Sequence, residues 1–86
     1  MRDLILMEKA HSAFDALAPS GAPRKALAGV IAELMDDGVP LVRPGDLSVL
    51  HGSAIMGRPV PGTDLVVCYV PGGEQVFVVN IRRHPA

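Results

Sequence analysis

Leu65–Ile81 reads LVVCYVPGGEQVFVVNI, and this stretch decides the fold. Two runs of apolar, largely β-branched residues, Leu65–Val70 and Val76–Ile81, flank a short segment that contains Pro71 and Gly72. Such runs between turn residues are typical of β-strands, and Pro-Gly fits the two central positions of a type II turn. The stretch therefore predicts an antiparallel hairpin. Because both of its faces are apolar, we expect the hairpin in the centre of the sheet, with helices covering one face.

The segments before the hairpin predict weaker structure. Leu47–Ile55 is interpreted as a weak strand that is interrupted by Gly52. Gly57–Thr63 (GRPVPGT) is interpreted as a loop, because two prolines and two glycines in seven residues are typical of a chain break. The second half of the chain thus predicts a three-stranded antiparallel meander.

The first half predicts helices on either side of a break at Ala18–Pro23. The second helix, from about Arg24 to Asp37, is indicated by an apolar stripe at the spacing i, i+3, i+4, i+7, which consists of Leu27, Val30, Ile31 and Leu34. Gly38 is expected to end this helix in the left-handed conformation. The two aspartates at its end, Asp36 and Asp37, are interpreted as a solvated surface or as a small acidic patch for a basic partner.

The first residues, Asp3–Met7 (DLILM), fit either a short buried strand or the start of a helix that continues through Glu8–Leu17. We favour a strand, followed by a helix that begins near Glu8. The prediction is an α+β fold in which two N-terminal helices pack on a small antiparallel sheet, in the order β-α-α-β-β-β. A chain of 86 residues is expected to form a single domain over residues 1–86.

The composition fits a reducing compartment and predicts a weak electrostatic field around the protein. Eight basic residues against nine acidic ones do not favour nucleic-acid binding by the chain alone, although they permit binding that another macromolecule leads. The one cysteine, Cys68, cannot form an internal disulfide, which fits the cytosol. Charges interrupt the early apolar cluster, so it predicts neither a signal peptide nor a membrane span. We expect a cytoplasmic protein.

Motifs for metal binding and nucleophilic catalysis are missing from the sequence. His11, His51 and His84 lie far apart without paired ligands around them, so we predict no metal and no cofactor. Cys68 lies within a predicted strand, where a thiol acts as a small buried hydrophobic group rather than as a nucleophile.

The remaining cluster of chemical interest is Arg82-Arg83-His84, directly after the last predicted strand. Strand alternation would turn Arg82 and Arg83 to opposite faces. With Arg58 and Arg43 at the same sheet edge, this set would suit a phosphodiester, because arginine stabilises a pentacoordinate phosphorus and histidine transfers a proton. The alternative is a charged, solvated end that keeps the sheet edge soluble.

Several segments resemble the RelE/ParE superfamily of type II toxin–antitoxin toxins. These are Ala26–Leu34 with Gly38–Leu41 after it, Gly57-Arg58-Pro59, Asp64–Val70, and Val76–His84. RelE-like members cut mRNA in the ribosomal A site, and ParE-like members inhibit DNA gyrase. The resemblance implies an antitoxin partner that holds the toxin inactive, with the ribosome and its mRNA, or gyrase, as the target.

By residue, the resemblance implies that Arg83 and His84 are catalytic and that Arg58 and Arg82 bind RNA phosphates. Asp64 is a departure, since members often carry arginine near this position, and an aspartate would repel the scissile phosphate. The leading hypothesis is a ribosome-dependent mRNA interferase, an endoribonuclease that inhibits translation. The alternatives are a gyrase-inhibiting toxin and a non-enzymatic module that binds another protein through an exposed sheet face or edge.

Overall fold

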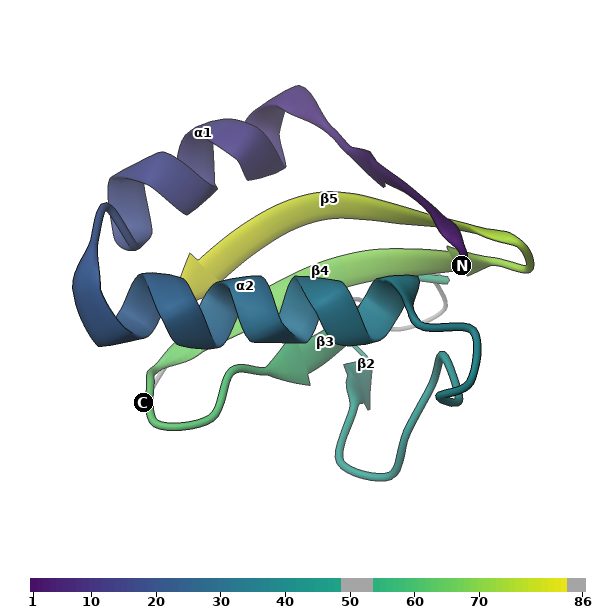
Figure 1. The fold of residues 1–86 in the computed structure, drawn as a ribbon. Helices are drawn as coiled ribbons and strands as arrows, with labels where there is room; N and C mark the ends of the chain where they lie inside the picture. The colour runs from purple at the N-terminus through teal and green to yellow at the C-terminus, as the bar shows by residue number, and fades with distance from the viewer. Residues whose placement is uncertain (49–53, 84–86) are drawn as a thin grey trace.

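The computed structural model describes residues 1–48 and 54–83. The elements in this part of the chain are β1 (Asp3–Leu6), α1 (Glu8–Leu17), α2 (Gly21–Met35), β2 (Leu47–Ser48), β3 (Met56–Pro59), β4 (Leu65–Gly72) and β5 (Gln75–Arg83). The strands form one sheet in the order β1-β5-β4-β3-β2. Helix α2 lies across the sheet and α1 runs beside β5 (Figure 1). The predicted α+β fold, with two N-terminal helices on a small sheet, is confirmed.

The sheet is mixed rather than purely antiparallel, because the first strand joins it in parallel. Asp3 pairs with Gln75 and Leu6 with Val78, so β1 runs alongside β5. This confirms the favoured prediction of a strand before the first helix. The predicted antiparallel pairing of the C-terminal strands is confirmed, and β1 adds a parallel edge strand to this sheet, because the helices and strands between β1 and β5 let both run in one direction.

The β4–β5 hairpin lies in the centre of the sheet, as predicted, but its turn lies two residues further along the chain. Pro71 and Gly72 belong to β4, so their prediction as the centre of the turn is wrong. The connection is Gly73-Glu74, and Gly73 has a φ of 76°. A type II′ hairpin turn needs a positive φ at its first central residue. The fixed φ of Pro71 is compatible with a strand, whereas Gly73 provides the turn conformation.

A bulge in β5 allows this strand to follow the core. Cys68 pairs with Asn80 and Tyr69 with Val78, which leaves Val79 as an extra residue. Val78 and Ile81 are therefore both buried in the same core although they are three residues apart. A bulge of this kind re-aims the side chains that follow it, and here the arginines at the end of β5 follow it.

Strand β3 occupies part of the segment that was predicted to be a loop. Gly57 pairs with Cys68 and Arg58 with Val67, so the prediction of a loop from Gly57 is wrong. The apolar strand β4 needs a partner on this side, and Pro59 lies beyond the two β3 residues that pair with β2, so it stands at the sheet edge, where proline is tolerated. Of the predicted strand Leu47–Ile55, Leu47 and Ser48 form β2, and residues 49–53, which include Gly52, lie outside the described residues.

Helix α2 begins earlier and ends earlier than expected. It ends at Met35, and the extended conformation of Asp36 terminates it. Gly38 does not have the predicted left-handed conformation, since its φ is not positive. Instead its N–H donates a 2.9 Å hydrogen bond to the carboxylate of Asp36. Asp37 accepts a 2.6 Å hydrogen bond from the terminal amine of Met1, which is an exposed contact within the chain.

The core lies between the sheet and the two helices and is almost entirely aliphatic. Three of the four predicted stripe residues of α2 are buried, and Ile31 is half-buried. The buried cluster consists of Ala10, Ala18, Leu27, Val30, Leu34, Val60, Leu65, Val67, Tyr69, Val76, Val78 and Ile81. No helix in the described part of the chain is long and apolar enough to cross a membrane.

Candidate functional site

Arg82 and Arg83 form the exposed C-terminal end of β5. Arg83 pairs in register with Leu65, and Arg82 pairs with Val66. Leu65 belongs to the core beneath the helices, so Arg83 lies at the margin of the helix-covered face. Arg82 points to the opposite face, as strand alternation predicted.

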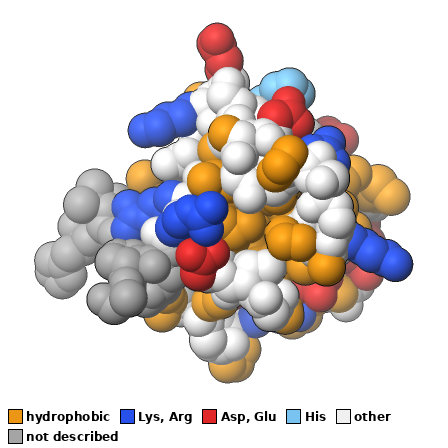
Figure 2. Space-filling model, turned by 90° about the vertical axis from the view of Figure 1, so that its left-hand side faces the viewer, with side chains coloured by type: hydrophobic (Ala, Val, Ile, Leu, Met, Phe, Trp, Pro, Cys, Tyr) orange, Lys and Arg blue, Asp and Glu red, His pale blue; other side chains and the backbone are white. Residues whose placement is uncertain are grey.

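Arg83 lines a groove at the end of the molecule where the helices meet the sheet. The other walls are Leu17 at the end of α1, Pro23 in the first turn of α2, and the turn Gly62–Leu65. Figure 2 looks onto this end, where basic side chains lie beside an acidic one and next to an apolar patch. The groove thus combines an apolar wall with a charged rim, which is a suitable surface for a ligand that carries both a ring and an anionic group.

Asp64 binds Arg83 directly. One guanidinium nitrogen of Arg83, Nη1, donates to both carboxylate oxygens of Asp64, at 2.9 and 3.0 Å. Both side chains are 60% exposed, so this is a surface ion pair of modest strength. Asp64, the departure noted in the sequence, is therefore the partner of Arg83, which was predicted to be catalytic.

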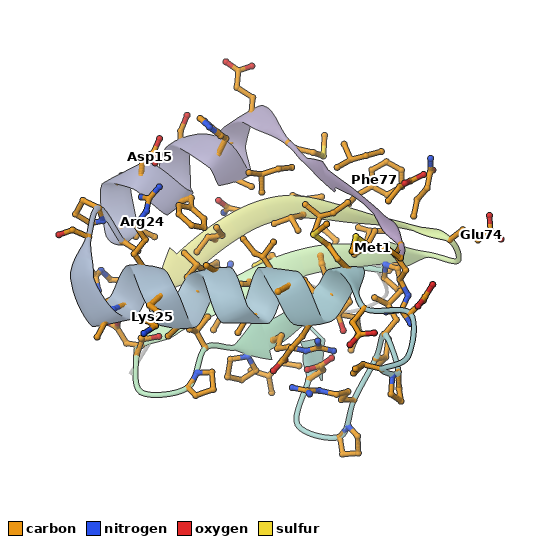
Figure 3. All side chains as sticks on the ribbon, in the orientation of Figure 1. Met1, Asp15, Arg24, Lys25, Glu74 and Phe77 are labelled. Carbon is orange, nitrogen blue, oxygen red and sulfur yellow. The ribbon has the colours of Figure 1, made fainter. Side chains whose placement is uncertain are left out.

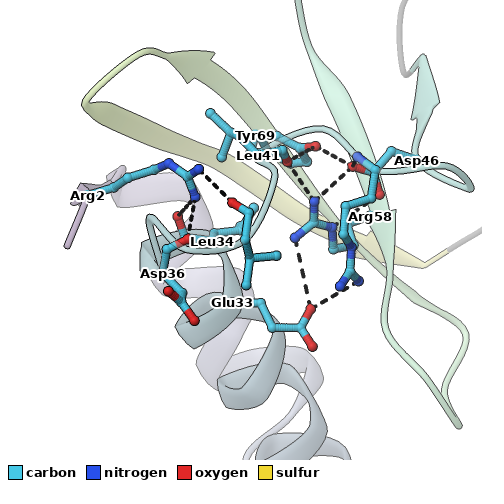
Figure 4. Close-up of polar contacts among 10 residues, drawn as sticks. Arg2, Glu33, Leu34, Asp36, Leu41, Asp46, Arg58 and Tyr69 are labelled. Carbon is cyan, nitrogen blue, oxygen red and sulfur yellow. Dashed lines mark hydrogen bonds and ion pairs between the residues drawn. The ribbon is translucent and has the colours of Figure 1, made fainter.

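Arg58 lies elsewhere, inside the fold, with only 1% of its surface exposed. Its Nε and Nη2 donate to the two oxygens of Asp46 at 3.1 and 3.0 Å, and Nη2 also donates to the carbonyl of Leu41 at 2.6 Å (Figure 4). The structure does not bring Arg58 together with Arg82 and Arg83. Its role in phosphate binding stays a prediction, and its burial gives that prediction no support.

The surroundings of Arg58 form a charged network, which we call the Arg58 cluster: Arg58, Asp46, Tyr69, Glu33 and Arg43. The hydroxyl of Tyr69 donates a short hydrogen bond to Asp46, and the Arg58 guanidinium lies 5.5 Å from the centre of the Tyr69 ring. Glu33 on α2 is 3.1 Å from Arg43 and 4.0 Å from Nη1 of Arg58. The Arg58 cluster thereby fastens the segment between α2 and β2 to both the sheet and α2.

The pKa values in this cluster favour the charged pair. Burial alone would raise the pKa of Asp46, but the hydrogen bonds from Arg58 and Tyr69 outweigh it and hold that pKa below its usual value. Burial, followed by the hydrogen bond to Asp46, raises the pKa of Tyr69 far above its usual value. At neutral pH the network therefore contains a carboxylate, a guanidinium and a neutral phenol.

The other predicted chemical groups lie apart from the groove or outside the described residues. His84 and His51 fall outside residues 1–48 and 54–83. Cys68 is buried in β4; burial raises the pKa of its thiol, and the positive charge of Arg82 offsets part of that rise. Within the described ranges, no group of three or more His, Cys, Asp or Glu could hold a metal ion.

Arg24 belongs to a separate surface contact between the helices. Its guanidinium lies 4.6 Å from the centre of the Phe14 ring and 3.4 Å from Asp15, and Figure 3 shows Arg24 directed toward Asp15. It also donates to the carbonyl of Ala18 at 3.1 Å. Arg24 thus joins the end of α1 to the start of α2, close to one wall of the groove.

Sequence reasoning missed Asp46 and Tyr69. A tyrosine in an otherwise aliphatic strand was an available signal, because a buried hydroxyl needs a hydrogen-bond partner. Nothing in the spacing of the sequence identified Asp46 as that partner.

Comparison with known proteins rests on solved structures, since no protein-family model matches the chain and no curated protein matches its sequence. A toxin from Helicobacter pylori, solved as a copper-bound mutant, superimposes with a TM-score of 0.73 at 18% identity, covering 98% of this chain and 96% of that one. A chain of the YoeB–YefM complex from Staphylococcus aureus gives a TM-score of 0.67 at 9% identity, covering 99% of each chain. A conserved hypothetical protein from Helicobacter pylori gives 0.61 at 17% identity, covering 98% and 96%. At these identities the likeness concerns the fold alone, and the chain has the fold of these solved structures, in agreement with the RelE-like fold that the sequence resemblance predicted.

Proposed function

We propose that the chain is the toxin of a type II toxin–antitoxin system and that it cleaves mRNA on the ribosome. The observation that carries the proposal is the match with a toxin from Helicobacter pylori over 98% of this chain. The exposed basic end of β5 supports the nuclease activity, because it presents the guanidinium of Arg83 in the wall of a groove and that of Arg82 on the opposite face of the strand.

In the proposed reaction, the ribose 2′-OH of the RNA loses its proton and its oxygen attacks the adjacent phosphate. The bond from phosphorus to the 5′-oxygen of the next nucleotide breaks, which leaves a 2′,3′-cyclic phosphate and a 5′-oxygen that takes up a proton. The guanidinium of Arg83 binds the phosphate and stabilises the charge that develops on its oxygens. His84 follows Arg83 in the sequence and is the proposed proton-transfer group. Arg82, on the other face of β5, would hold a flanking phosphate, and Arg58 would act through the fold by fixing β3 and the segment before β2.

Other macromolecules would contribute part of the RNA binding. The chain has a formal net charge of −1 and no strong field of its own to attract RNA. We propose that the ribosome presents the mRNA and that the protein works in the cytoplasm. One similar structure is a complex of two proteins, YoeB and YefM, which supports an antitoxin as the partner of this chain.

A second candidate function is inhibition of DNA gyrase. The Asp64–Arg83 pair favours it, because a gyrase inhibitor needs no free phosphate site at the end of β5. A third candidate, a non-enzymatic protein-interaction module, is favoured by exposed apolar side chains on the edge strand β1 and just after it, Ile5 at 40% and Met7 at 47%.

Induced expression in a bacterial host tests the proposal. We expect growth arrest with cleavage inside translated mRNAs, and relief of the arrest by Arg83→Ala combined with His84→Ala. Glu74→Gln is the matched control, because Glu74 lies in the turn at the opposite end of the β4–β5 hairpin. Growth arrest with intact mRNA and altered plasmid supercoiling would contradict the nuclease activity and support inhibition of gyrase. Normal growth at high expression would contradict the toxin.

A further inference from the structure

The ion pair at the mouth of the groove occupies the arginine on which the proposed function depends. Among the described residues, Asp64 is the only hydrogen-bond or ion-pair partner of the Arg83 side chain. Carboxylate and phosphate oxygens bind the same guanidinium N–H groups. A phosphate can therefore take its full set of contacts with Arg83 only if Asp64 moves aside.

We propose that Asp64 is an internal competitor that lowers the affinity of this end of β5 for RNA and thereby determines which RNA is bound. The proposal rests on the proposed function, since it assumes that Arg83 binds a phosphate of the substrate. If Asp64 stays in place, its negative charge lies about 3 Å from Arg83 and repels the incoming phosphate. If it leaves, the ion pair is lost.

The backbone holds Asp64 next to Arg83, so the competition follows from the fold. Leu65 pairs with Arg83 across the hairpin, which places Asp64 beside the end of β5. The hydroxyl of Thr63 accepts a 3.0 Å hydrogen bond from the N–H of Leu65 and donates a 2.9 Å hydrogen bond to the carbonyl of Val60. These two bonds hold the backbone on both sides of Asp64. The carboxylate can turn toward solvent, but its Cα stays next to Arg83.

The exposure of the pair makes the competition reversible. Both side chains are 60% exposed, and pairs of this kind contribute little to stability because water solvates the separated charges. A free RNA strand has to displace Asp64 by its own contacts, so its affinity for Arg83 is lowered by the small free energy of the ion pair. An RNA that is already held by the ribosome needs no further loss of translational freedom, so it can displace Asp64. Asp64 thus restricts the chain to RNA that another macromolecule presents.

The test is the binding of a short fluorescein-labelled single-stranded RNA to the full chain, measured by anisotropy over a series of salt concentrations. The variants are Asp64→Asn, Arg83→Ala, both changes together, and Glu74→Gln, which removes the same charge at the far end of the hairpin. We expect Asp64→Asn to bind about 3- to 10-fold tighter than wild type. The slope of log affinity against log salt should steepen by about 0.7, as one additional phosphate contact requires.

The control and the double variant separate competition from a general effect of charge. Glu74→Gln should match wild type within about twofold, and Arg83→Ala should abolish the gain that Asp64→Asn gives. If Arg83→Ala weakens binding but Asp64→Asn leaves it unchanged, the inference is overturned and the phosphate site of the proposed function stands. If Asp64→Asn binds tighter even without Arg83, the inference is also overturned. If no variant binds RNA at any salt concentration, the proposed phosphate site fails together with it.

Discussion

The carboxylate of Asp46 accepts two hydrogen bonds from the guanidinium of Arg58, with both side chains at most 4% exposed. The segment that carries Asp46 has no regular structure between α2 and β2, so this pair and its neighbours hold it in place. A buried pair of opposite charges is costly to break from one side only, because the remaining charge is left without a partner in a dry environment.

Asp46→Asn should lower the free energy of unfolding by about 3 to 5 kcal/mol, since it removes one charge of the buried pair and leaves Arg58 with only the half-exposed Glu33, 4.0 Å away, as an ionic partner. Urea denaturation followed by circular dichroism measures this change. Asp15→Asn is the matched control, because it neutralises an aspartate in an exposed ion pair, with Arg24. Equal stability of the two variants would show that the buried pair does not hold the fold.

The Asp46–Arg58 pair should also give the protein a sensitivity to acid. The pKa of Asp46 is lower in the folded chain than in the unfolded chain, so the unfolded state takes up the proton first as the pH falls. The stabilisation is complete above the unfolded pKa, about 3.9, and is lost as the pH falls through the lower folded value. Urea midpoints between pH 7 and pH 3 should fall more steeply for wild type than for Asp46→Asn. Parallel curves would contradict the assignment.

Deprotonation of Tyr69 should lower the stability of the fold at alkaline pH. Its pKa is raised in the folded chain, so its contribution is complete below the unfolded value, about 10, and declines as the pH rises above that value. Tyr69→Phe should cost about 1 to 3 kcal/mol at neutral pH, because Asp46 loses a donor. The variant should then show a smaller further loss than wild type between pH 9 and pH 11. An equal alkaline loss in both proteins would place the titrating group elsewhere.

The fold could be predicted from the sequence where local pattern and tertiary contact agree. The β-branched runs of β4 and β5 and the apolar stripe of α2 each specify one element and the face that it buries. The turn was misplaced because Pro71 is compatible with both a turn and a strand, and the positive φ of Gly73 decides between them. Strand β3 was missed because its pairing with β4 overrides the low strand propensity of its glycine and proline.

In the candidate site, too, the features set by local sequence could be predicted, and those set by contacts between distant residues could not. The opposite faces of Arg82 and Arg83 follow from strand alternation, which is a local property. The burial of Arg58 could not be predicted, because its partners lie 12 residues before it and 11 residues after it in the sequence, at Asp46 and Tyr69. Asp64 was recognised as unfavourable for a phosphate, but its contact with Arg83 depends on the register of the hairpin.

The most direct measurement is cleavage of a defined mRNA by the purified chain on stalled ribosomes, with the new 5′ ends mapped by primer extension. We expect wild type and Glu74→Gln to cut within the ribosome-bound codon. Arg83→Ala should slow cleavage by about 10²- to 10³-fold, as loss of a group that stabilises the transition-state charge requires. Arg82→Ala should slow it by less than about tenfold, because it removes only a flanking phosphate contact. Intact mRNA after incubation with wild-type protein, or cleavage that proceeds equally well without Arg83, would contradict the proposed nuclease site.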